Sequence, residues 1–152
     1  FIVYYPEKVS ANTVVNQALT TVDFQQTLLG LVGVNPSGME EGRDASALFV
    51  NASRVTAWQD IAFIRQASKT NNGWLAAITD RYKLVYAPKG EPWLFDLEKD
   101  PDELINFYQD KAYSDTIRLM ATELKQYAIK RNDIFLLGND HMSAQLEKAI
   151  TQ

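Results

Sequence analysis

Five acidic residues lie close together in the second half of the chain: Asp96, Glu98, Asp100, Asp102 and Glu103. The first three stand at positions 1, 3 and 5 of a calcium-binding loop, where carboxylate oxygens hold the ion. Position 6 of such a loop needs glycine but holds Pro101, and position 12 needs glutamate but holds Phe107. We therefore favour a structural role for this run, a capped turn on a solvated edge, over a calcium site.

Basic residues extend from the middle of the chain into its second half: Arg54, Arg65, Lys69, Arg81 and Lys83. Guanidinium and ammonium groups in such a set could bind an anionic ligand. Carboxylates outnumber them, however, with 19 aspartates and glutamates against 15 lysines and arginines in the whole chain. We therefore expect these residues to be solvated or paired with carboxylates.

Histidine and tryptophan are two further residue types with chemical potential. His141 is the one histidine, and its neighbour Asp140 is poorly placed to orient it, so we expect a surface residue. Trp58 and Trp74 flank irregular segments and could stack on a sugar ring, whereas Trp93 begins a strand pattern and is predicted to lie in the core. For each tryptophan, packing in a core or an interface is the favoured hypothesis.

The composition excludes several classes of function. The chain has 152 residues, 46% hydrophobic and 22% charged, a net charge of −4 and no cysteine. The charge argues against a nucleic-acid binder, and the lack of cysteine excludes disulfides, thiolate zinc sites and a cysteine nucleophile. The longest apolar run, residues 28–34, is far shorter than the ~20 residues of a membrane span. The sequence also lacks a glycine-rich phosphate loop, Gly-x-Ser-x-Gly and His-Glu-x-x-His.

The first 60 residues are predicted to hold strands at residues 1–5 and 13–20 and a helix at 22–32. In that helix Phe24, Leu28 and Leu31 share one apolar face, Thr21 or Asp23 could cap the start, and glycine follows the end. A short helical turn is expected at 45–48. Because the chain begins at Phe1 directly with an apolar run, we expect it to be a piece of a longer protein.

Residues 61–152 predict a small α+β unit, an antiparallel four-stranded sheet packed by a long helix. Short turns separate four apolar or alternating runs, which pair most simply as antiparallel neighbours. A capping pattern at Asp100, Pro101 and Glu103 predicts a short helix that ends near Asn106. Longer helices are expected at 114–131 and 142–151. The strands are expected at residues 61–66, 74–79, 82–87 and 93–97.

Three pieces of the first 60 residues resemble the C-terminal part of the sulfatases, within the alkaline-phosphatase-like superfamily. Ile2-Val3-Tyr4-Tyr5-Pro6 is similar to the strand and proline that follow that family's last catalytic motif. Residues 22–33 resemble its Val-Asp-x-x-Pro-Thr-Leu-Leu-x-Leu-x-Gly helix, with Gln26 in place of the proline. Residues 42–48, Gly-Arg-Asp-Ala-Ser-Ala-Leu, resemble its Gly-x-Ser-Leu segment with extra residues.

Two later pieces strengthen the resemblance, which covers residues 1–131. Residues 77–86 resemble the family's strand-turn-strand with Arg-Thr-x-x-Tyr-Lys-Tyr. Residues 94–106, Leu-Phe-Asp-Leu-Glu-Lys-Asp-Pro-Asp-Glu-Leu-Ile-Asn, resemble its Leu-Tyr-Asp-Leu-x-x-Asp-Pro-x-Glu-x-x-Asn signature. The resemblance implies that residues 1–60 are the end of a large α/β catalytic domain and that residues 61–152 form a smaller sheet-and-helix subdomain.

The family hydrolyses sulfate esters with a calcium ion and a formylglycine made from Cys or Ser in Cys/Ser-x-Pro-x-Arg. That motif is absent here, so the resemblance implies an inactive C-terminal fragment without catalytic or metal residues of its own. Its partners would be an upstream catalytic domain and a sulfate-ester substrate such as a sulfated sugar, and the isolated fragment could self-associate. The resemblance also implies an exported or periplasmic parent.

A polar loop between two strands is the expected rim of the substrate cleft, since loops on rigid scaffolds often carry function. Two alternatives remain open: a stand-alone binding or interaction module, and the tail of a phosphate or phosphonate ester hydrolase of the same superfamily. The rim residues are Arg65, Lys69, Asn71, Asn72 and Trp74.

Overall fold

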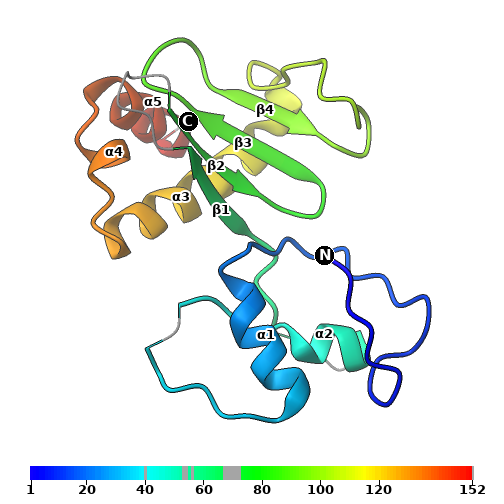
Figure 1. The fold of residues 1–152 in the computed structure, drawn as a ribbon. Helices are drawn as coiled ribbons and strands as arrows, with labels where there is room; N and C mark the ends of the chain where they lie inside the picture. The colour runs from blue at the N-terminus through cyan, green and yellow to red at the C-terminus, as the bar shows by residue number, and fades with distance from the viewer. Residues whose placement is uncertain (40, 53–54, 56, 67–72, 152) are drawn as a thin grey trace. The chain divides into compact units, whose positions relative to one another are not determined.

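The computed structural model describes residues 1–39, 41–52, 55, 57–66 and 73–151. The chain divides into two compact units, Phe1–Asp60 (unit 1) and Ile61–Gln152 (unit 2), which are drawn in Figure 1. Unit 1 holds the helices α1 (Asp23–Val32) and α2 (Ser46–Asn51). In unit 2, four strands are followed by a 3₁₀ turn and three helices. These are β1 (Ala62–Gln66), β2 (Trp74–Ile78), β3 (Tyr82–Tyr86), β4 (Trp93–Asp96), η2 (Lys111–Tyr113), α3 (Ser114–Lys130), α4 (Ile134–Leu137) and α5 (Asp140–Thr151).

The two strands expected in unit 1 do not form. Residues 1–5 and 13–20 are irregular, and the Ile2 and Tyr4 side chains are 94% and 90% exposed. A strand needs a neighbour for its backbone N–H and C=O groups, and the described part of unit 1 contains no other strand. These two runs therefore have the composition of strands, but the described part of unit 1 offers them no partner strand.

Helix α1 forms close to its expected place, but its buried face differs from the prediction. Asp23, Thr27 and Leu31 are buried, whereas Phe24 and Leu28 are 44% and 38% exposed. The helix ends as expected at a glycine, Gly33, whose φ of 75° is left-handed and whose N–H bonds to the carbonyl of Gly30. The helix itself was predicted correctly. Its buried face, however, is determined by the polar contacts of Asp23 and Thr27 and not by the largest apolar side chains.

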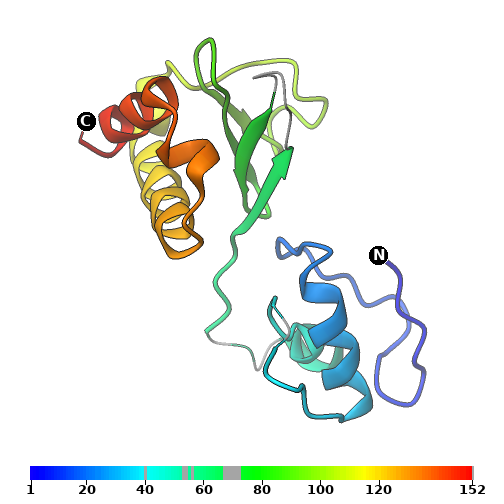
Figure 2. The ribbon, with the colours of Figure 1, turned by 60° about the vertical axis from the view of Figure 1, so that its left-hand side comes forward.

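Unit 2 has the α+β architecture expected from the sequence. Its strands pair antiparallel in the order β1-β2-β3-β4, joined by hairpins. Helices α3, α4 and α5 all lie on one side of this sheet (Figure 2). Connections of a few residues in the sequence favour this order, because consecutive strands that are close along the chain pair most simply with their direct neighbours.

Alternate strand residues face the helices and form the core. Leu75, Ala77, Leu84, Tyr86 and Leu94 pack there against the apolar stripe of α3. In that stripe Ile117, Met120 and Leu124 are buried as predicted. Each large apolar side chain buried in this way stabilises the fold by about 1.5–3 kcal/mol. The core thus fixes the position of the sheet against α3.

The segment after β4 consists of turns and irregular backbone, so the short helix predicted to end near Asn106 is absent. The Asn106 side chain accepts a hydrogen bond from the Leu94 N–H at 2.9 Å and donates one to the Pro92 carbonyl at 3.0 Å. The Phe107 N–H bonds to the Leu94 carbonyl at 2.8 Å. These bonds satisfy the edge of β4, which a helix at this place would leave open.

The chain then forms α3, the unpredicted single turn α4, and α5. Asp133 caps α4 by accepting hydrogen bonds from the Phe135 and Leu136 N–H groups. Helix α5 packs on α3, with Met142 and Leu146 in the core. None of the helices in the described part of the chain has the length and apolar character that crossing a bilayer requires.

Candidate functional site

A polar cluster in unit 1 is centred on Asp23 and Arg43. The Asp23 carboxylate accepts hydrogen bonds from the Arg43 backbone N–H at 2.8 Å and from its Nη2 at 3.0 Å. The Thr20 N–H adds a third hydrogen bond at 3.0 Å. Burial alone would raise the pKa of Asp23, but these hydrogen bonds outweigh it and hold the pKa below its usual value. The carboxylate is therefore ionised, and both of its oxygens accept hydrogen bonds.

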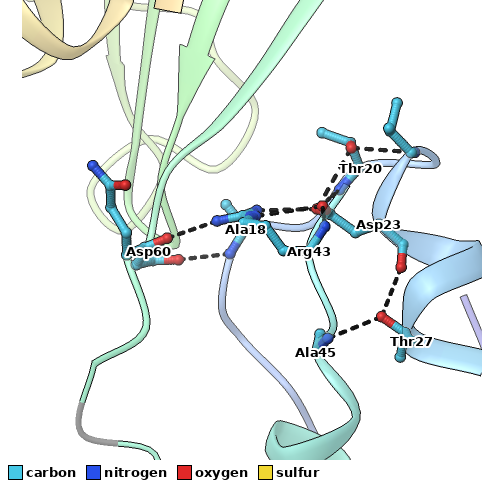
Figure 3. Close-up of polar contacts among 9 residues, drawn as sticks. Ala18, Thr20, Asp23, Thr27, Arg43, Ala45 and Asp60 are labelled. Atoms are coloured by element: carbon cyan, nitrogen blue, oxygen red, sulfur yellow. Dashed lines mark hydrogen bonds and ion pairs between the residues drawn. The ribbon is translucent and has the colours of Figure 1, made fainter. Parts of the chain in front are cut away.

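The Arg43 guanidinium reaches other parts of unit 1 as well. Its Nη2 donates to the Ala18 carbonyl at 3.1 Å and its Nη1 to the Gln59 carbonyl at 2.8 Å, while the Trp58 ring lies 4.4 Å from the guanidinium carbon. The Ala18 N–H donates to Asp60 at 2.6 Å, and Figure 3 shows Arg43 with Ala18, Asp23 and Asp60. The cluster ties the start of α1 to two segments distant in sequence, around Arg43 and around Gln59, which is a structural role.

Thr27 and Gly42 explain two further pieces of the sequence pattern. The Thr27 hydroxyl donates to the Asp23 carbonyl at 2.7 Å and accepts from the Ala45 N–H at 3.1 Å (Figure 3). Gly42 has a φ of 99°, and a Cβ there would lie 2.2 Å from the Val22 carbonyl oxygen. Residues 22–33 and residues 42–48, which the sequence pattern showed as separate pieces, thus contact each other directly.

A second polar cluster lies in unit 2 around Asp96, which is fully buried. Arg81 donates to its two oxygens at 3.0 and 2.9 Å, and the Tyr113 hydroxyl donates at 2.9 Å. The Lys99 ammonium donates to the Tyr113 oxygen at 2.8 Å. The hydrogen bond from Arg81 is the main cause that lowers the pKa of Asp96 to about 2. This cluster locks the β2–β3 turn to the end of β4.

The acidic run does not fit a calcium ion. The Asp96 oxygens are occupied by Arg81, Tyr113 and backbone N–H groups, and the Asp100 carboxylate accepts the Ile105 N–H at 2.7 Å. Within the described ranges, His, Cys, Asp and Glu side chains nowhere gather in threes that could hold a metal. The capped turn predicted here forms around Asp100, but Asp96 and Asp100 are buried rather than solvated.

Of the five basic residues singled out in the sequence, the three that the structure describes are paired with carboxylates, as expected. Arg65 Nη1 lies 3.0 Å from both oxygens of Asp133, and Lys83 pairs with Glu103. Arg81 pairs with Glu98 as well as with Asp96. Arg54 and Lys69 lie outside the described residues.

The two expected rim residues that the structure describes, Arg65 and Trp74, lie on opposite faces of the sheet. Arg65 stands opposite Leu75 in the sheet, on the helix-covered side, where it reaches Asp133. Trp74 stands opposite Gln66, so its half-buried side chain lies on the other side of the sheet. The two are close in sequence register but do not share a face. Lys69, Asn71 and Asn72 lie outside the described residues.

The remaining aromatic candidates and the histidine have definite positions. Trp93 is 51% exposed, so its predicted place in the core is wrong: it faces away from the helices, opposite Val85. Trp58 is half-buried beneath Arg43. His141 is on the surface as predicted, and its Nε2 donates to the Gly90 carbonyl at 2.8 Å. That hydrogen bond tethers the β3–β4 turn to α5.

Comparisons with known proteins agree with the geometry. The family model described as "N-sulphoglucosamine sulphohydrolase, C-terminal" matches residues 1–130. An arylsulfatase of Clostridium perfringens (strain 13 / Type A) is 26% identical over 143 residues, covering 91% of this chain and 29% of the relative.

Two solved structures share the fold. The structure of BT4656 in complex with its substrate D-glucosamine-2-N,6-O-disulfate aligns with a TM-score of 0.69 at 20% identity, covering 85% of this chain and 28% of that one. The phosphonate monoester hydrolase of Agrobacterium radiobacter aligns with a TM-score of 0.53 at 25% identity, covering 76% and 26%. The chain thus spans less than a third of the length of these three relatives. Because the family model covers most of its length, the chain belongs to the N-sulphoglucosamine sulphohydrolase C-terminal family, the C-terminal part of sulfatases in the alkaline-phosphatase-like superfamily.

Proposed function

We propose that this chain is the C-terminal part of a sulfuric ester hydrolase, and that it completes the fold of a catalytic domain encoded upstream. The match of the family model over residues 1–130 carries the proposal, and the arylsulfatase relative supports it. The upstream domain supplies the nucleophile, a formylglycine, and the ligands of a calcium ion. The two polar clusters of this chain are engaged in holding its own fold, and the chain alone is inactive.

The surface of unit 1 supports a role in completing a larger domain. Phe1 and Ile2 are 66% and 94% exposed, and Phe24 and Leu28 form an exposed apolar stripe on α1. A hollow of about 320 Å³, lined largely by apolar atoms of Phe1, Leu19 and Phe24, opens beside that stripe. Exposed apolar surface of this kind marks a place where another segment packs.

The substrate class we propose is a sulfated sugar. BT4656, which shares the fold, is bound to D-glucosamine-2-N,6-O-disulfate as its substrate. In this chain Trp74 begins β2 with a half-buried indole, and the face of an indole suits a sugar ring. Arg65, the next candidate, is tied to Asp133 but its side chain remains 43% exposed. We propose Trp74, with Lys69, Asn71 and Asn72, for one wall of the substrate cleft, and we leave Arg65 out of that wall because it lies on the opposite face of the sheet, paired with Asp133.

The test uses the full-length protein that contains this chain, assayed with D-glucosamine-2-N,6-O-disulfate and with simple aryl sulfates. Trp74→Ala should raise KM several-fold for the sugar and leave kcat close to that of the parent, because stacking contributes to binding and not to the reacting bond. Leu119→Ala, at an exposed site on α3, is the matched control and should leave both constants unchanged. Unchanged kinetics in a folded Trp74→Ala protein would remove Trp74 from the cleft.

A second candidate function is hydrolysis of a phosphate or phosphonate ester. The likeness to the phosphonate monoester hydrolase favours it, because that enzyme shares the fold over 76% of this chain. The same purified protein assayed with matched aryl sulfate, aryl phosphate and phosphonate monoesters separates the two. Preference for the sulfate supports the first proposal, and preference for either phosphorus ester replaces it.

A further inference from the structure

Arg65 lies outside the proposed wall of the cleft, and its ion pair connects the exposed end of β1 to the start of α4. Strand β1 is at the edge of the sheet, and its residues 64–66 are exposed. Arg65 Nη1 donates to both oxygens of Asp133 at 3.0 Å, and the Asp133 side chain is only 8% exposed. Because this carboxylate is largely shielded from water, solvent screens the pair less than a pair of two exposed side chains. Asp133 lies beyond residues 1–130, the part that the family model matches, so the family match does not explain the pair.

Helix α4 can support this pair because other contacts hold the helix in place. The Asp133 carboxylate caps α4 by accepting hydrogen bonds from the Phe135 and Leu136 N–H groups at 3.0 and 3.3 Å. Leu136 is fully buried in the core, and its carbonyl accepts a hydrogen bond from the Ser143 hydroxyl of α5 at 2.9 Å. The position of α4 therefore has several determinants besides its pair with Arg65.

The same helix meets the start of β2 through Phe135. Gly73 is buried and immediately precedes Trp74. A Cβ at Gly73 would lie 2.8 Å from Phe135 Cζ and 2.6 Å from the Gln66 carbonyl oxygen, so the backbone there has room only for glycine. Gly73 thus lies against both α4 and the end of β1. Since Trp74 is the next residue, contacts that fix Gly73 also fix the place from which the indole projects.

We propose that Asp133 is a positioning residue for Trp74. It holds β1 to α4 through Arg65, and Phe135 of the same helix holds Gly73 at the start of β2. Trp74 projects from the opposite face of the sheet, so α4 holds the hairpin from the side that does not bear the indole. A binding group held by such supporting contacts has less freedom to lose when a ligand binds. This inference rests on the proposed function, since it takes Trp74 as a contact of the sugar.

The test compares variants of the full-length protein that contains this chain, assayed with D-glucosamine-2-N,6-O-disulfate. Asp133→Asn keeps the side-chain volume and the cap of α4 but removes the charge that holds Arg65. KM should rise by roughly twofold or more with kcat close to that of the parent, because the change acts on the position of a binding group. Asp115→Asn, the same change in an exposed ion pair on α3, is the matched control and should alter neither constant.

A cycle with Trp74→Ala separates positioning from a general structural effect. If Asp133 acts through Trp74, Asp133→Asn should raise KM no further once the indole has been removed. Arg65→Gln should raise KM as Asp133→Asn does, and the two changes together should exceed neither alone. An equal rise in KM with and without the indole would overturn the inference. An unchanged KM in Asp133→Asn, beside a raised KM in Trp74→Ala, would also overturn it and would leave the proposed function intact.

Hydrogen exchange of the same full-length variants reports on the hairpin without substrate. The amides of residues 73–75 should exchange several-fold faster in Asp133→Asn than in the parent, whereas those of residues 82–86 in β3 should be unchanged. Equal exchange at residues 73–75 in both proteins would contradict the proposed support. Faster exchange, combined with an unchanged KM in Trp74→Ala, would retain the positioning of Trp74 and reject its proposed contact with the sugar.

Discussion

Arg81 holds both carboxylate oxygens of Asp96, at 3.0 and 2.9 Å, with Asp96 completely removed from solvent. Arg81 stands in the turn between β2 and β3, and Asp96 is the last residue of β4. The Leu97 N–H returns a hydrogen bond to the Arg81 carbonyl at 2.8 Å. The pair therefore fixes the register between the middle and the edge of the sheet.

Asp96→Ala should destabilise unit 2 by roughly 3 kcal/mol, the lower part of the range for breaking a buried ion pair. Arg81 keeps its partner Glu98 at 2.6 Å, which limits the loss. Arg118→Ala, which removes the exposed pair with Asp115, should cost less than about 1 kcal/mol. Denaturant-dependent hydrogen exchange of the β3 and β4 amides measures both values in unit 2. Equal losses would show that the Asp96 cluster contributes no more than a surface pair.

The pH dependence of stability should carry the signature of Asp96. Its pKa falls from 3.8 to about 2 in the folded state, chiefly because Arg81 donates to the carboxylate. A lowered folded pKa means that the stabilisation is present above the unfolded value and disappears as pH falls from roughly 4 toward 2. Asp96→Asn should lose stability less steeply over that interval. Parallel curves for the parent and the variant would refute the assignment.

Asn106 should act as a side-chain substitute for a neighbouring strand. Asn106→Ala leaves the Leu94 N–H and the Pro92 carbonyl without partners and should cost about 1–3 kcal/mol. Asn106→Asp keeps the acceptor but loses the donor, so its cost should lie between zero and that of alanine. Faster exchange of the Leu94 amide is the direct readout. An unchanged exchange rate in the alanine variant would show that this edge is held by other contacts.

Gly42 and Gly38 offer a matched pair in unit 1. Both have positive φ, 99° and 86°, so alanine is strained at either position. At Gly38 a Cβ meets no atom within 4 Å, whereas at Gly42 it would lie 2.2 Å from the Val22 carbonyl oxygen. Gly42→Ala should therefore lower the stability of unit 1 by several times the loss caused by Gly38→Ala. Thermal unfolding of the two variants, compared with the parent, checks the ratio.

Several parts of unit 2 could be predicted from the sequence because their causes are local. Short turns between apolar runs define the four strands, and the stripe Ile117, Met120 and Leu124 defines the buried side of α3. The sequence also predicted that the basic residues pair with carboxylates. It could not identify Asp133 and Glu103 as the specific partners.

Other parts depend on contacts between distant residues. The capping pattern at Asp100 predicted a helix, but Asn106 bonds to Leu94 and Pro92 and holds the segment at the edge of β4 without helical structure. The inward side of α1 was set by the contact of Asp23 with Arg43 rather than by Phe24. A local pattern cannot reveal a partner many positions away, because the geometry that unites them exists only after folding.

The sequence by itself determined the family, the antiparallel sheet and the covering helix, since these follow from periodicity, turn residues and recognisable short patterns. Only the tertiary structure decided which strand residues face the helices. It placed Trp93 outside the core and left Arg65 and Trp74 on opposite sides of the sheet. Strand alternation assigns residues to two faces of the sheet but does not say which face a helix covers. The packing of α3 on one face decides this.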